Sequence, residues 1–291
     1  MIVLRTMLFT PGNNMRMIAK SGDRGADAVI LDLEDSVPIP DKETGRLFVR
    51  DALADVAAGG SQVYVRINAL STGLADDDLA WIVRPGLSGI VQPKAERASD
   101  VTDLCARLDA LESEHGVNAG TVRVVPLIET ALGVENAGDI AGASERVVAV
   151  AFGGVDFSRD MGVELTPQGA ELAYPRARIA VAARASGVLA IDTPCLQVRD
   201  DDRLTADTRA ARQLGFRGKL LIHPSQVDTV NELLSPSDND VAYARKVVDA
   251  FEAARAKGLG AISLDGKMID VANFQQAKDV LAAADAIAAH R

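Results

Sequence analysis

Residues 123–130 have the sequence RVVPLIET, in which a short apolar run ends directly in an acidic residue, Glu129. A continuous apolar run of this length is typical of a strand that is buried on both faces, as in a parallel sheet covered by helices. We therefore expect a buried strand here, with an acid at its carboxyl end.

The same pattern recurs along most of the chain. Short apolar runs occupy residues 6–9, 28–33, 62–67, 89–92, 123–128, 147–152, 188–191 and 219–222. Apolar residues at helical spacing lie between them, for example Leu104, Leu108 and Leu111. Eight strand–helix units in about 235 residues fit the size of a (β/α)8 TIM barrel. A doubly wound open sheet is the alternative, because the number of strands does not prove that the sheet closes.

The last part of the chain differs from this pattern, and we divide the protein into a barrel at residues 1–235 and an extension at residues 236–291. The extension contains a helical stretch at 238–257, a hairpin around Asp265 and Gly266, and an alanine-rich helical stretch at 271–289. An appendage with this much apolar surface should dock on its own barrel or on a neighbouring subunit. We expect a C-terminal lid that also takes part in oligomerisation.

Composition argues against several classes of protein. A formal net charge of -10 disfavours a nucleic-acid partner, because phosphate binding requires clustered Lys and Arg. No segment reaches the ~20 apolar residues that span a bilayer, and the start of the chain is too short for a signal peptide. We therefore expect a cytoplasmic protein with no membrane partner. Two distant cysteines, Cys105 and Cys195, predict buried thiols and no disulfide framework.

Polar residues follow most of the apolar runs. They are Asp32, Glu34, Asp35, Arg66, Asn68, Gln92, Lys94, Glu129, Asp156, Asp192 and His223. In a β/α barrel the carboxyl ends of the strands converge on one rim, where such enzymes place their chemistry. Helix capping explains a single acid at one strand end, but charges of both signs at so many ends favour a functional site over caps and salt bridges alone.

Glu129 and Asp156 follow consecutive runs and are candidate metal ligands. Mg²⁺ prefers oxygen ligands in octahedral geometry and usually takes one or two carboxylates. The sequence contains no His and Cys ligand set, which argues against zinc. Each acid alone is explained equally well as a cap of the following helix. Together with Arg66, the two acids indicate a site for a metal and a second oxyanion.

Short segments spread in order through essentially the whole chain carry a resemblance to a known family. They are LFTPG (8–12), DLED (32–35), VRIN (65–68), PK (93–94), IETA (128–131), FGGVD (152–156), GFRGK (215–219), IHP (222–224) and DGKMID (265–270). With these segments the chain resembles the citrate lyase β-subunit-like branch of the HpcH/HpaI aldolase superfamily, which includes malyl-CoA and citramalyl-CoA lyases. Each segment is short, but their joint occurrence at these spacings is specific.

The resemblance implies a magnesium-dependent (β/α)8 barrel that forms a homotrimer or a hexamer, with Mn²⁺ as an alternative ion. Glu129 and Asp156 match the metal ligands of the family, and Arg66 matches the residue that contacts the reacting oxygens. Asp265 matches an acid on a C-terminal lid that reaches into the active site of the next subunit. The residues expected to contact the CoA thioester are Phe9, Pro11, Arg16, Lys20, Arg66, Lys94, His223 and Pro224. Of these, Arg16 and Lys20 are expected on the helix after the Pro-Gly loop.

The chain departs from the family pattern in two places. Asn13 follows the Pro-Gly pair, where the family often has Ser. Cys195, Leu196 and Gln197 stand where family members often carry an aromatic and an acidic residue. The related branch that acts without CoA uses a histidine near the end of the first strand, and the first histidine here is His115, which disfavours that branch.

We expect a retro-Claisen cleavage of a 3-hydroxyacyl-CoA such as malyl-, citramalyl- or citryl-CoA into acetyl-CoA, or a homologue, and a 2-oxo acid. Magnesium held by Glu129 and Asp156 would lower the pKa of the substrate hydroxyl. Arg66 would stabilise the enolate, and Asp265 would protonate it. Without the resemblance, Asp265 is better explained as a turn residue, since Asp-Gly is a strong hairpin signal.

Several assignments keep alternatives. Glu34 and Asp35 are expected to orient Arg66 or Lys94, with a contact to the metal through water as the alternative. His223 is expected to be a hydrogen-bonding rim residue rather than a general base. A thioesterase acting on the same acyl-CoA, and a non-catalytic CoA- or carrier-binding subunit of a lyase complex, are the alternative functions. The oxo acid stays open, because one methyl group provides only ~1–3 kcal/mol of discrimination.

Overall fold

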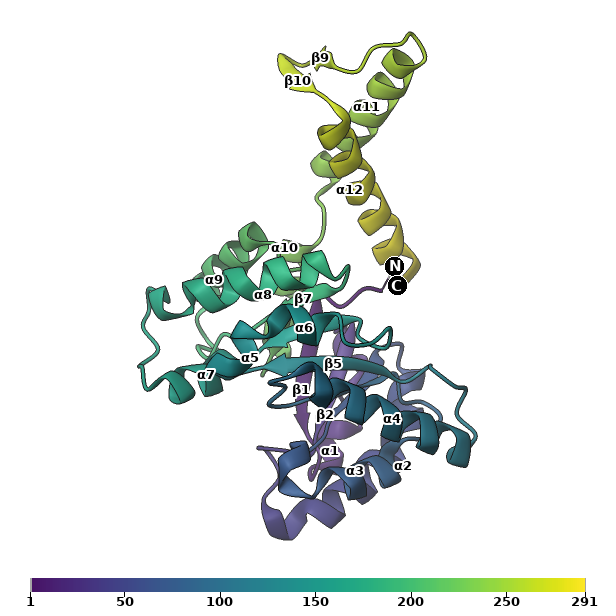
Figure 1. Cartoon of the computed structure of the whole chain (residues 1–291), viewed down its shortest axis with the longest axis vertical. Helices are drawn as coiled ribbons and strands as arrows, with labels where there is room; N and C mark the ends of the chain where they lie inside the picture. The colour runs from purple at the N-terminus through teal and green to yellow at the C-terminus, as the bar shows by residue number, and fades with distance from the viewer. Residues whose placement is uncertain (1, 291) are drawn as a thin grey trace. The chain divides into compact units, whose positions relative to one another are not determined.

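The structure is a computed structural model that describes residues 2–290, and its larger part is a closed barrel of eight parallel strands (Figure 1). The strands are β1 (Thr6–Pro11), β2 (Ala28–Asp32), β3 (Gln62–Arg66), β4 (Gly89–Gln92), β5 (Arg123–Ile128), β6 (Ala149–Phe152), β7 (Leu189–Asp192) and β8 (Gly218–Leu221). Each strand pairs with the next, and β8 returns to β1 with Leu220 opposite Met7. The sheet is therefore closed. The predicted TIM barrel is confirmed and the open sheet is excluded.

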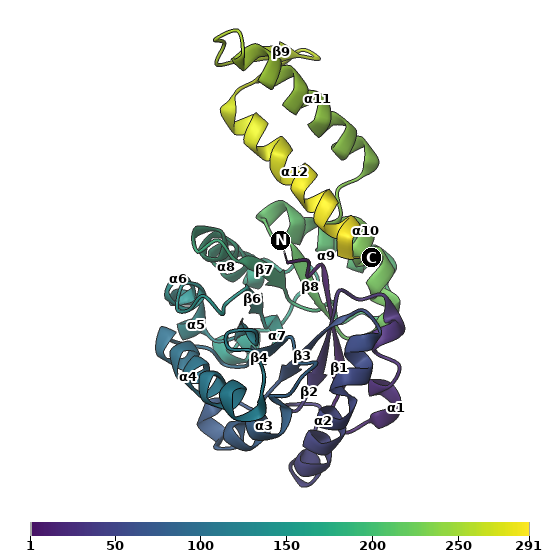
Figure 2. The same cartoon turned by 90° about the vertical axis from the view of Figure 1, so that its right-hand side faces the viewer.

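Helices surround the strands, as Figure 2 shows for α2, α3, α4, α6 and α8. The helices of the barrel are α1 (Met15–Ile18), α2 (Lys42–Ala58), α3 (Ala75–Ile82), α4 (Ala98–His115), α5 (Ala131–Glu135), α6 (Ala137–Ala141), α7 (Gly154–Met161), α8 (Ala173–Ala185), α9 (Asp201–Leu214) and α10 (Val227–Leu234). The prediction that Lys20 lies on the helix after β1 was wrong. Helix α1 ends at Ile18, so Lys20 lies in the turn after the helix and not on it.

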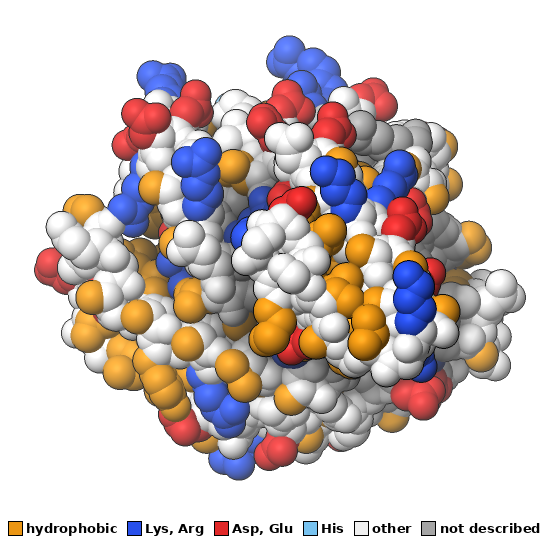
Figure 3. Space-filling model, turned by 90° about the horizontal axis from the view of Figure 1, so that it is seen from above, with side chains coloured by type: hydrophobic (Ala, Val, Ile, Leu, Met, Phe, Trp, Pro, Cys, Tyr) orange, Lys and Arg blue, Asp and Glu red, His pale blue; other side chains and the backbone are white. Residues whose placement is uncertain are grey.

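Charges of both signs lie interspersed on the face of the molecule that Figure 3 shows, where Asp and Glu side chains alternate with Lys and Arg side chains. None of the helices within residues 2–290 is long and apolar enough to cross a membrane.

Cys105 and Cys195 are both free and buried, as predicted from their separation in the sequence.

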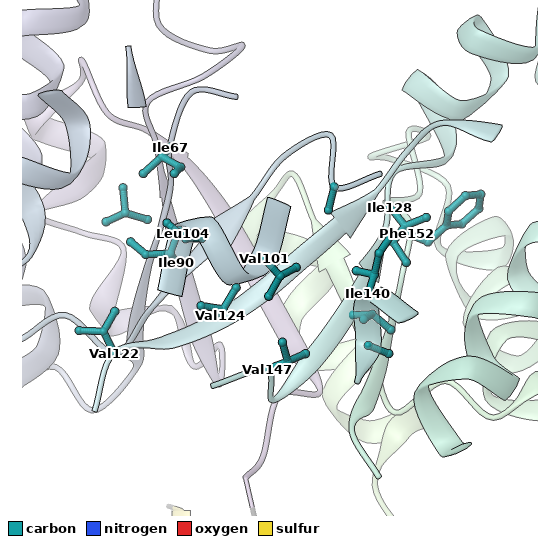
Figure 4. Packing of buried hydrophobic residues seen from close by; sticks show 14 of the residues in the cluster. Ile67, Ile90, Val101, Leu104, Val122, Val124, Ile128, Ile140, Val147 and Phe152 are labelled. Carbon is teal, nitrogen blue, oxygen red and sulfur yellow. The ribbon is translucent and has the colours of Figure 1, made fainter. Parts of the chain in front are cut away.

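The core of the barrel wall lies between the outer faces of the strands and the helices that cover them. Figure 4 shows Ile90 and Val124 on neighbouring strands facing Leu104 of α4, with Ile140 of α6 packed nearby. All four side chains are fully buried. Burial of apolar surface on this scale is the dominant favourable term in folding. The helical spacing of Leu104 with its neighbours in the sequence reflects this contact.

The amino ends of the strands carry a charge network of their own. Arg146, just before β6, donates to both carboxylate oxygens of Glu112 at 2.9 and 2.6 Å and to the Val122 carbonyl at 2.9 Å. Glu112 also accepts the Val122 N–H at 2.8 Å. Every charge of this buried group has a partner, which is the arrangement that a low-dielectric interior requires. The network ties α4 to the start of β5.

By its contacts the chain divides into two compact units, of which the barrel comprises Leu4–Asn231. The other unit begins at Glu232 and contains α11 (Asp238–Arg255), β9 (Ile262–Leu264), β10 (Lys267–Ile269) and α12 (Val271–His290). The rings of Phe251 and Phe274 stack at 5.0 Å between α11 and α12. The two short strands are antiparallel. These elements match the helices and the hairpin predicted for the extension.

Replacement of Gly218 by alanine tests the closure of the barrel. A Cβ at this position would lie 2.0 Å from the Leu4 carbonyl oxygen and 2.6 Å from the Ile191 side chain. We expect Gly218→Ala to lower the free energy of unfolding by about 1–3 kcal/mol, because the close approach of backbone cannot relax without strain. The measurement is urea unfolding followed by circular dichroism.

Gly138→Ala in α6 is the matched control, because nothing lies within 4 Å of its added Cβ. Alanine is also the better helix former, so this variant should be neutral or more stable by up to ~1 kcal/mol. Equal stability of the two variants would show that β8 does not pack as tightly as described.

Candidate functional site

Arg66 and Asp32 form the central ion pair at the carboxyl ends of the strands. They are the last residues of β3 and β2 and lie opposite one another in the parallel register. Arg66 donates from Nε and Nη2 to the two oxygens of Asp32, both at 2.7 Å. Burial alone would raise the pKa of Asp32, but the charge and hydrogen bonds of Arg66 hold that pKa below its ordinary value. Such a bidentate pair fixes both the position and the plane of the guanidinium.

Asp32 has a further role in its own loop. Its oxygens accept the backbone N–H groups of Glu34 at 3.0 Å and Ser36 at 3.1 Å. Asp32 belongs to the DLED segment of the sequence, but roles were predicted only for Glu34 and Asp35. The signal that would have identified it is its register, because the last residues of adjacent parallel strands face the same rim.

Phe9 of β1 covers the guanidinium of Arg66 from across β2, which lies between β1 and β3 in the sheet. The Arg66 Cζ atom lies 4.8 Å from the centre of the Phe9 ring. A cation over an aromatic face is attracted by the ring quadrupole, which adds to the orienting effect of Asp32. Phe9 was predicted to contact the CoA thioester; in the structure it contacts Arg66.

Glu34 lies between the two cations of the site. Its Oε2 is 3.0 Å from Arg66 Nη1, and its Oε1 accepts a hydrogen bond of 3.1 Å from Lys94 Nζ. Burial raises the pKa of Glu34, while the charges of Arg66 and Lys94 oppose that rise. Asp35 is 3.4 Å from Arg66 Nη1 and has a mostly exposed side chain. Both acids thus contact Arg66, and Lys94 contacts Glu34.

Glu129 is almost fully buried, with 2% of its surface exposed. Its Oε1 accepts the backbone N–H of Lys94 at 2.9 Å and lies 3.6 Å from Lys94 Nζ. Lys94 has a positive φ of 52°, which is uncommon for a residue with a side chain and aims its N–H at Glu129. A Cβ on Gly153 would lie 2.6 Å from Glu129 Oε2, so the carboxylate fits only beside a glycine.

The electrostatics of Glu129 set it apart from an ordinary surface acid. Burial raises the pKa of Glu129 to about 7, and the negative charges of Glu34 and Asp156 add to the rise. The charge and backbone N–H of Lys94 oppose it without cancelling it. The ionised carboxylate is therefore under-compensated by the protein's own groups.

Asp156 lies in the first turn of α7, directly after β6. Strands β5 and β6 are neighbours, with Ile128 opposite Phe152, so Glu129 and Asp156 follow adjacent strands. The side chain of Asp156 is 26% exposed and lies 3.2 Å from the exposed Arg159. It is near enough for its charge to raise the pKa of Glu129. One acid is thus deeply buried and the other faces solvent.

The donor set can be tested for a hard cation. No group of three or more His, Cys, Asp or Glu side chains that could hold a metal ion occurs within residues 2–290. Mg²⁺ needs only one or two carboxylates, since waters and substrate oxygens complete its shell. Five carboxylates gather at this rim, and they are contacted by three cations, Arg66, Lys94 and the exposed Arg159. This excess of negative charge around Glu129 fits a divalent ion.

Four of the residues expected to contact CoA are exposed on the barrel, after β1 and after β8. Arg16 and Lys20 are exposed after β1. His223 caps the turn after β8 by accepting the Ser225 N–H at 3.2 Å, and Pro224 begins that turn. Asn13, which replaces the usual serine of the family, donates to Asp41 at 3.1 Å. These contacts account for His223 as a hydrogen-bonding residue of the rim.

Asp192, at the end of β7, is one of the polar residues noted at the strand ends, and it has a structural role. It is fully buried and accepts hydrogen bonds from Arg176 and from Lys219. Asp207 completes the group by pairing with the same two cations. Two acids and two bases therefore neutralise each other. The sequence could not distinguish this balanced network from a functional acid, because its partners are distant in the chain.

Asp265 belongs to the other compact unit. It occupies the turn between β9 and β10 with a φ of 50°, followed by Gly266 with a φ of 77°. Two consecutive positive φ values define the tight turn that an Asp-Gly pair favours. Its side chain is exposed.

A closed β/α barrel with an acid-rich rim around an anchored arginine is the scaffold of an enzyme class with metal-assisted chemistry. The profile of the HpcH/HpaI aldolase/citrate lyase family matches residues 5–224, and the chain belongs to this family.

Individual relatives match over nearly the whole chain. Citrate lyase subunit beta of Leuconostoc mesenteroides subsp. cremoris is 39% identical over 282 residues, which cover 97% of this chain and 93% of the relative. The human mitochondrial citramalyl-CoA lyase is 31% identical, with 97% and 86% covered. The solved structure of protein CitE from Mycobacterium tuberculosis, in complex with magnesium, acetoacetate and coenzyme A, is 30% identical with a TM-score of 0.77 and covers 97% of this chain and 98% of its own.

The raised pKa of Glu129 predicts how stability depends on pH in the metal-free protein. The folded state holds a proton on Glu129 up to a pKa of about 7, whereas an unfolded glutamate releases it near its ordinary value. The free energy of unfolding should therefore fall as pH rises from ~4.5 to ~7, by on the order of 3 kcal/mol from this residue. Urea unfolding in EDTA at pH 5 and pH 8 measures the fall.

Glu129→Gln should remove this contribution and flatten the pH dependence. Glu164→Gln, at an exposed position, is the control that should keep the wild-type dependence. The same fall in both variants would contradict the assignment of a buried, under-compensated carboxylate at position 129.

Proposed function

We propose that this protein is a magnesium-dependent lyase that cleaves, or in reverse forms, the carbon–carbon bond of a 3-hydroxyacyl-CoA to give acetyl-CoA or a homologue and a 2-oxo acid. The observation that carries the proposal is the placement of Arg66 beside Glu34 on the same rim as Glu129 and Asp156, which follow the adjacent strands β5 and β6. Relatives named as citrate lyase β-subunits and as citramalyl-CoA lyase support the reaction class.

Glu129 and Asp156 are proposed to hold the magnesium ion. A bound Mg²⁺, for which Mn²⁺ is the alternative, supplies Lewis-acid activation of the hydroxyl and carboxylate oxygens of the substrate. The Lys94 N–H and the space beside Gly153 orient the carboxylate of Glu129 for this task. The charge excess of the rim supports a cation here. The magnesium in the related CitE structure supports the same assignment.

Arg66 is proposed to stabilise the negative charge that develops when the carbon–carbon bond breaks. Asp32 uses Nε and one N–H of Nη2, which leaves the second Nη2 N–H for a substrate oxygen. A pre-oriented donor of this kind contributes roughly 3–4 kcal/mol to transition-state stabilisation. Asp32 and Phe9 hold the guanidinium in place, so little reorganisation accompanies the reaction.

Asp265 is proposed to deliver a proton to the carbon of the enolate of acetyl-CoA. Cleavage converts the substrate hydroxyl into a carbonyl and releases its proton, while the product carbon needs one proton, so the two proton movements balance. A carboxyl group that closes over the site can donate the proton to carbon. We propose that Asp265 does so in the neighbouring subunit of a homotrimer or hexamer. Its position at the tip of a tight turn, with an exposed side chain, supports a role in a contact outside its own unit.

The CoA moiety is proposed to lie along the loops that carry Pro11, Arg16 and Lys20, with His223 and Pro224 at the rim. The exposed basic side chains after β1 support binding of its phosphates. Lys94 is already engaged by Glu34 and Glu129, so we assign it to holding these acids rather than to CoA. We propose a cytoplasmic location, where acyl-CoA thioesters are substrates.

The alternative of a subunit that works only in a complex is favoured by one observation, because relatives of this chain are named as subunits of citrate lyase. A panel of malyl-, citramalyl- and citryl-CoA assayed with the purified protein decides between the functions. Formation of a 2-oxo acid identifies the lyase and its substrate. Free CoA together with the intact hydroxy acid would identify a thioesterase, and no turnover by the protein alone would favour the complex.

Asp156→Asn should abolish magnesium-dependent turnover in this assay while leaving the fold intact. The substitution removes one of two carboxylate ligands but keeps the size of the side chain. We also expect Mg²⁺ to raise the thermal midpoint of the wild-type protein and not that of the variant, which differential scanning calorimetry measures. Asp139→Asn on the exposed face of α6 is the control and should behave as wild type. Unchanged activity of Asp156→Asn would refute the assigned site.

Mixed oligomers test whether Asp265 acts in a neighbouring subunit. Arg66→Ala and Asp265→Asn should each be inactive, but co-expression of the two should restore up to about one quarter of wild-type activity, because some sites then combine an intact barrel with an intact neighbouring turn. Arg66→Ala co-expressed with Asp156→Asn should stay inactive, because both residues belong to one barrel. Recovery in the second pair, or none in the first, would contradict the shared site.

A further inference from the structure

Lys42, at the start of α2, is a buried cation that the proposed chemistry does not use. Only 7% of its surface is exposed. Its Nζ donates to the Leu33 carbonyl at 2.5 Å, to the Glu34 carbonyl at 2.8 Å and to Asn68 Oδ1 at 2.6 Å. A lysine ammonium has three donors, so all of them are used. Two belong to the loop after β2 and one to the loop after β3.

Asn68 extends this contact into a chain of buried polar groups. Its amide donates to the Leu33 carbonyl at 3.0 Å and to Asp78 Oδ2 at 2.7 Å, and its backbone N–H donates to the same Asp78 oxygen at 2.8 Å. Asp78 in turn accepts from Arg46 Nε at 2.7 Å. The chain Lys42–Asn68–Asp78–Arg46 therefore joins α2 and α3 beneath the two loops that carry Glu34 and Arg66.

The network fixes the backbone on both sides of the Glu34 side chain. The Glu34 N–H is held by Asp32, and its carbonyl is held by Lys42. The Leu33 N–H donates to the Arg66 carbonyl at 2.9 Å, while the Leu33 carbonyl accepts from both Lys42 and Asn68. The backbone on both sides of Glu34 is therefore fixed, and the Glu34 carboxylate lies between Arg66 and Lys94.

Burial of an ammonium is costly, and it is tolerated here because three acceptors surround the charge. Burial lowers the pKa of Lys42, and the nearby acids Asp78, Asp32 and Glu34 oppose that shift. A neutral donor could satisfy one or two of the acceptors, but three acceptors from two loops converge on a single point charge. This geometry suits a residue that holds two rim loops in one relative position.

We propose that Lys42 is a positioning residue of the site, which sets the orientation of Glu34, and through it of Arg66 and Lys94, by clamping the loops after β2 and β3. The inference rests on the proposed function for its catalytic consequence, but the clamp itself is a property of these loops. Arg66 is held by Asp32 as well, so loss of Lys42 should loosen the pair Glu34–Lys94 more than the pair Asp32–Arg66.

Lys42→Met removes the three donors and keeps the length of the side chain. We expect kcat for the thioester to fall by about 10- to 100-fold, as for other residues that orient a first contact shell. The KM should change by less than about threefold, because the loss falls on the transition state. Hydrogen–deuterium exchange of peptides covering residues 31–37 should be about tenfold faster than in wild type, since the loop opens locally.

Arg146→Met is the matched control, because it removes a buried cation with several partners at the opposite ends of the strands. It should lower the thermal midpoint to a similar degree without changing kcat per folded molecule or the exchange of residues 31–37. Asn68→Ala provides a second route should Lys42→Met not fold. Its effect on kcat should resemble that of Lys42→Met, and the double variant should be no worse than either, because the two residues act as one unit.

The outcomes separate this inference from the proposed function. If the wild-type protein turns over no thioester, but hydrogen–deuterium exchange is faster in Lys42→Met and not in Arg146→Met, the lyase function is refuted and the clamping role of Lys42 is supported. If the wild-type protein is active and the kcat of both Lys42→Met and Asn68→Ala is within about twofold of the wild-type value, the clamping role of Lys42 is refuted and the lyase function is supported. Equal losses of kcat in Lys42→Met and Arg146→Met would show that Lys42 merely stabilises the fold.

Discussion

The carboxyl ends of parallel strands in a closed barrel must meet on one rim, and the arrangement of charge in this protein depends on that constraint. Asp32 and Arg66 pair with two bonds because they end adjacent strands in the same register. Glu129 and Asp156 approach each other for the same reason. A side chain at the end of one strand thus gains partners from strands far away in the sequence, without any long connecting loop.

Balance of charge distinguishes the functional rim from the structural networks. Asp192 and Asp207 face Arg176 and Lys219, two acids against two bases, and every group is paired. At the rim the acids outnumber the bases, and Glu129, which is almost fully buried, has a raised pKa. A protein tolerates such an excess where a ligand supplies the missing positive charge, because perturbed titration gathers at functional sites.

The residues of the site that would contact substrate or metal are held in place by residues that would not. Arg66 and Glu129 are the groups that face the proposed chemistry, and each is oriented by a residue that does not face it. Asp32 and Phe9 orient Arg66, while the unusual backbone of Lys94 and the absence of a side chain at Gly153 orient Glu129. Below them, Lys42 and Asn68 hold the loops. Orientation of this kind reduces the reorganisation that a reaction requires.

The sequence predicted the eight strands and the elements of the extension, because short apolar runs and helical spacing are local consequences of burial on one or both faces. It favoured a closed barrel over an open sheet, but closure itself is shown only by the pairing of β8 with β1 in the structure. It also indicated Arg66, Glu129 and Asp156, since each follows such a run. Only the tertiary structure decided which polar residues pair. Asp32 and Asp192 end their strands alike, yet one anchors Arg66 and the other belongs to a buried neutral network. Lys42 was invisible in the sequence, because its three acceptors lie on two different loops and its burial is a property of the folded chain. The physical reason is that electrostatic partners are chosen by distance in space, whereas a sequence records only distance along the chain.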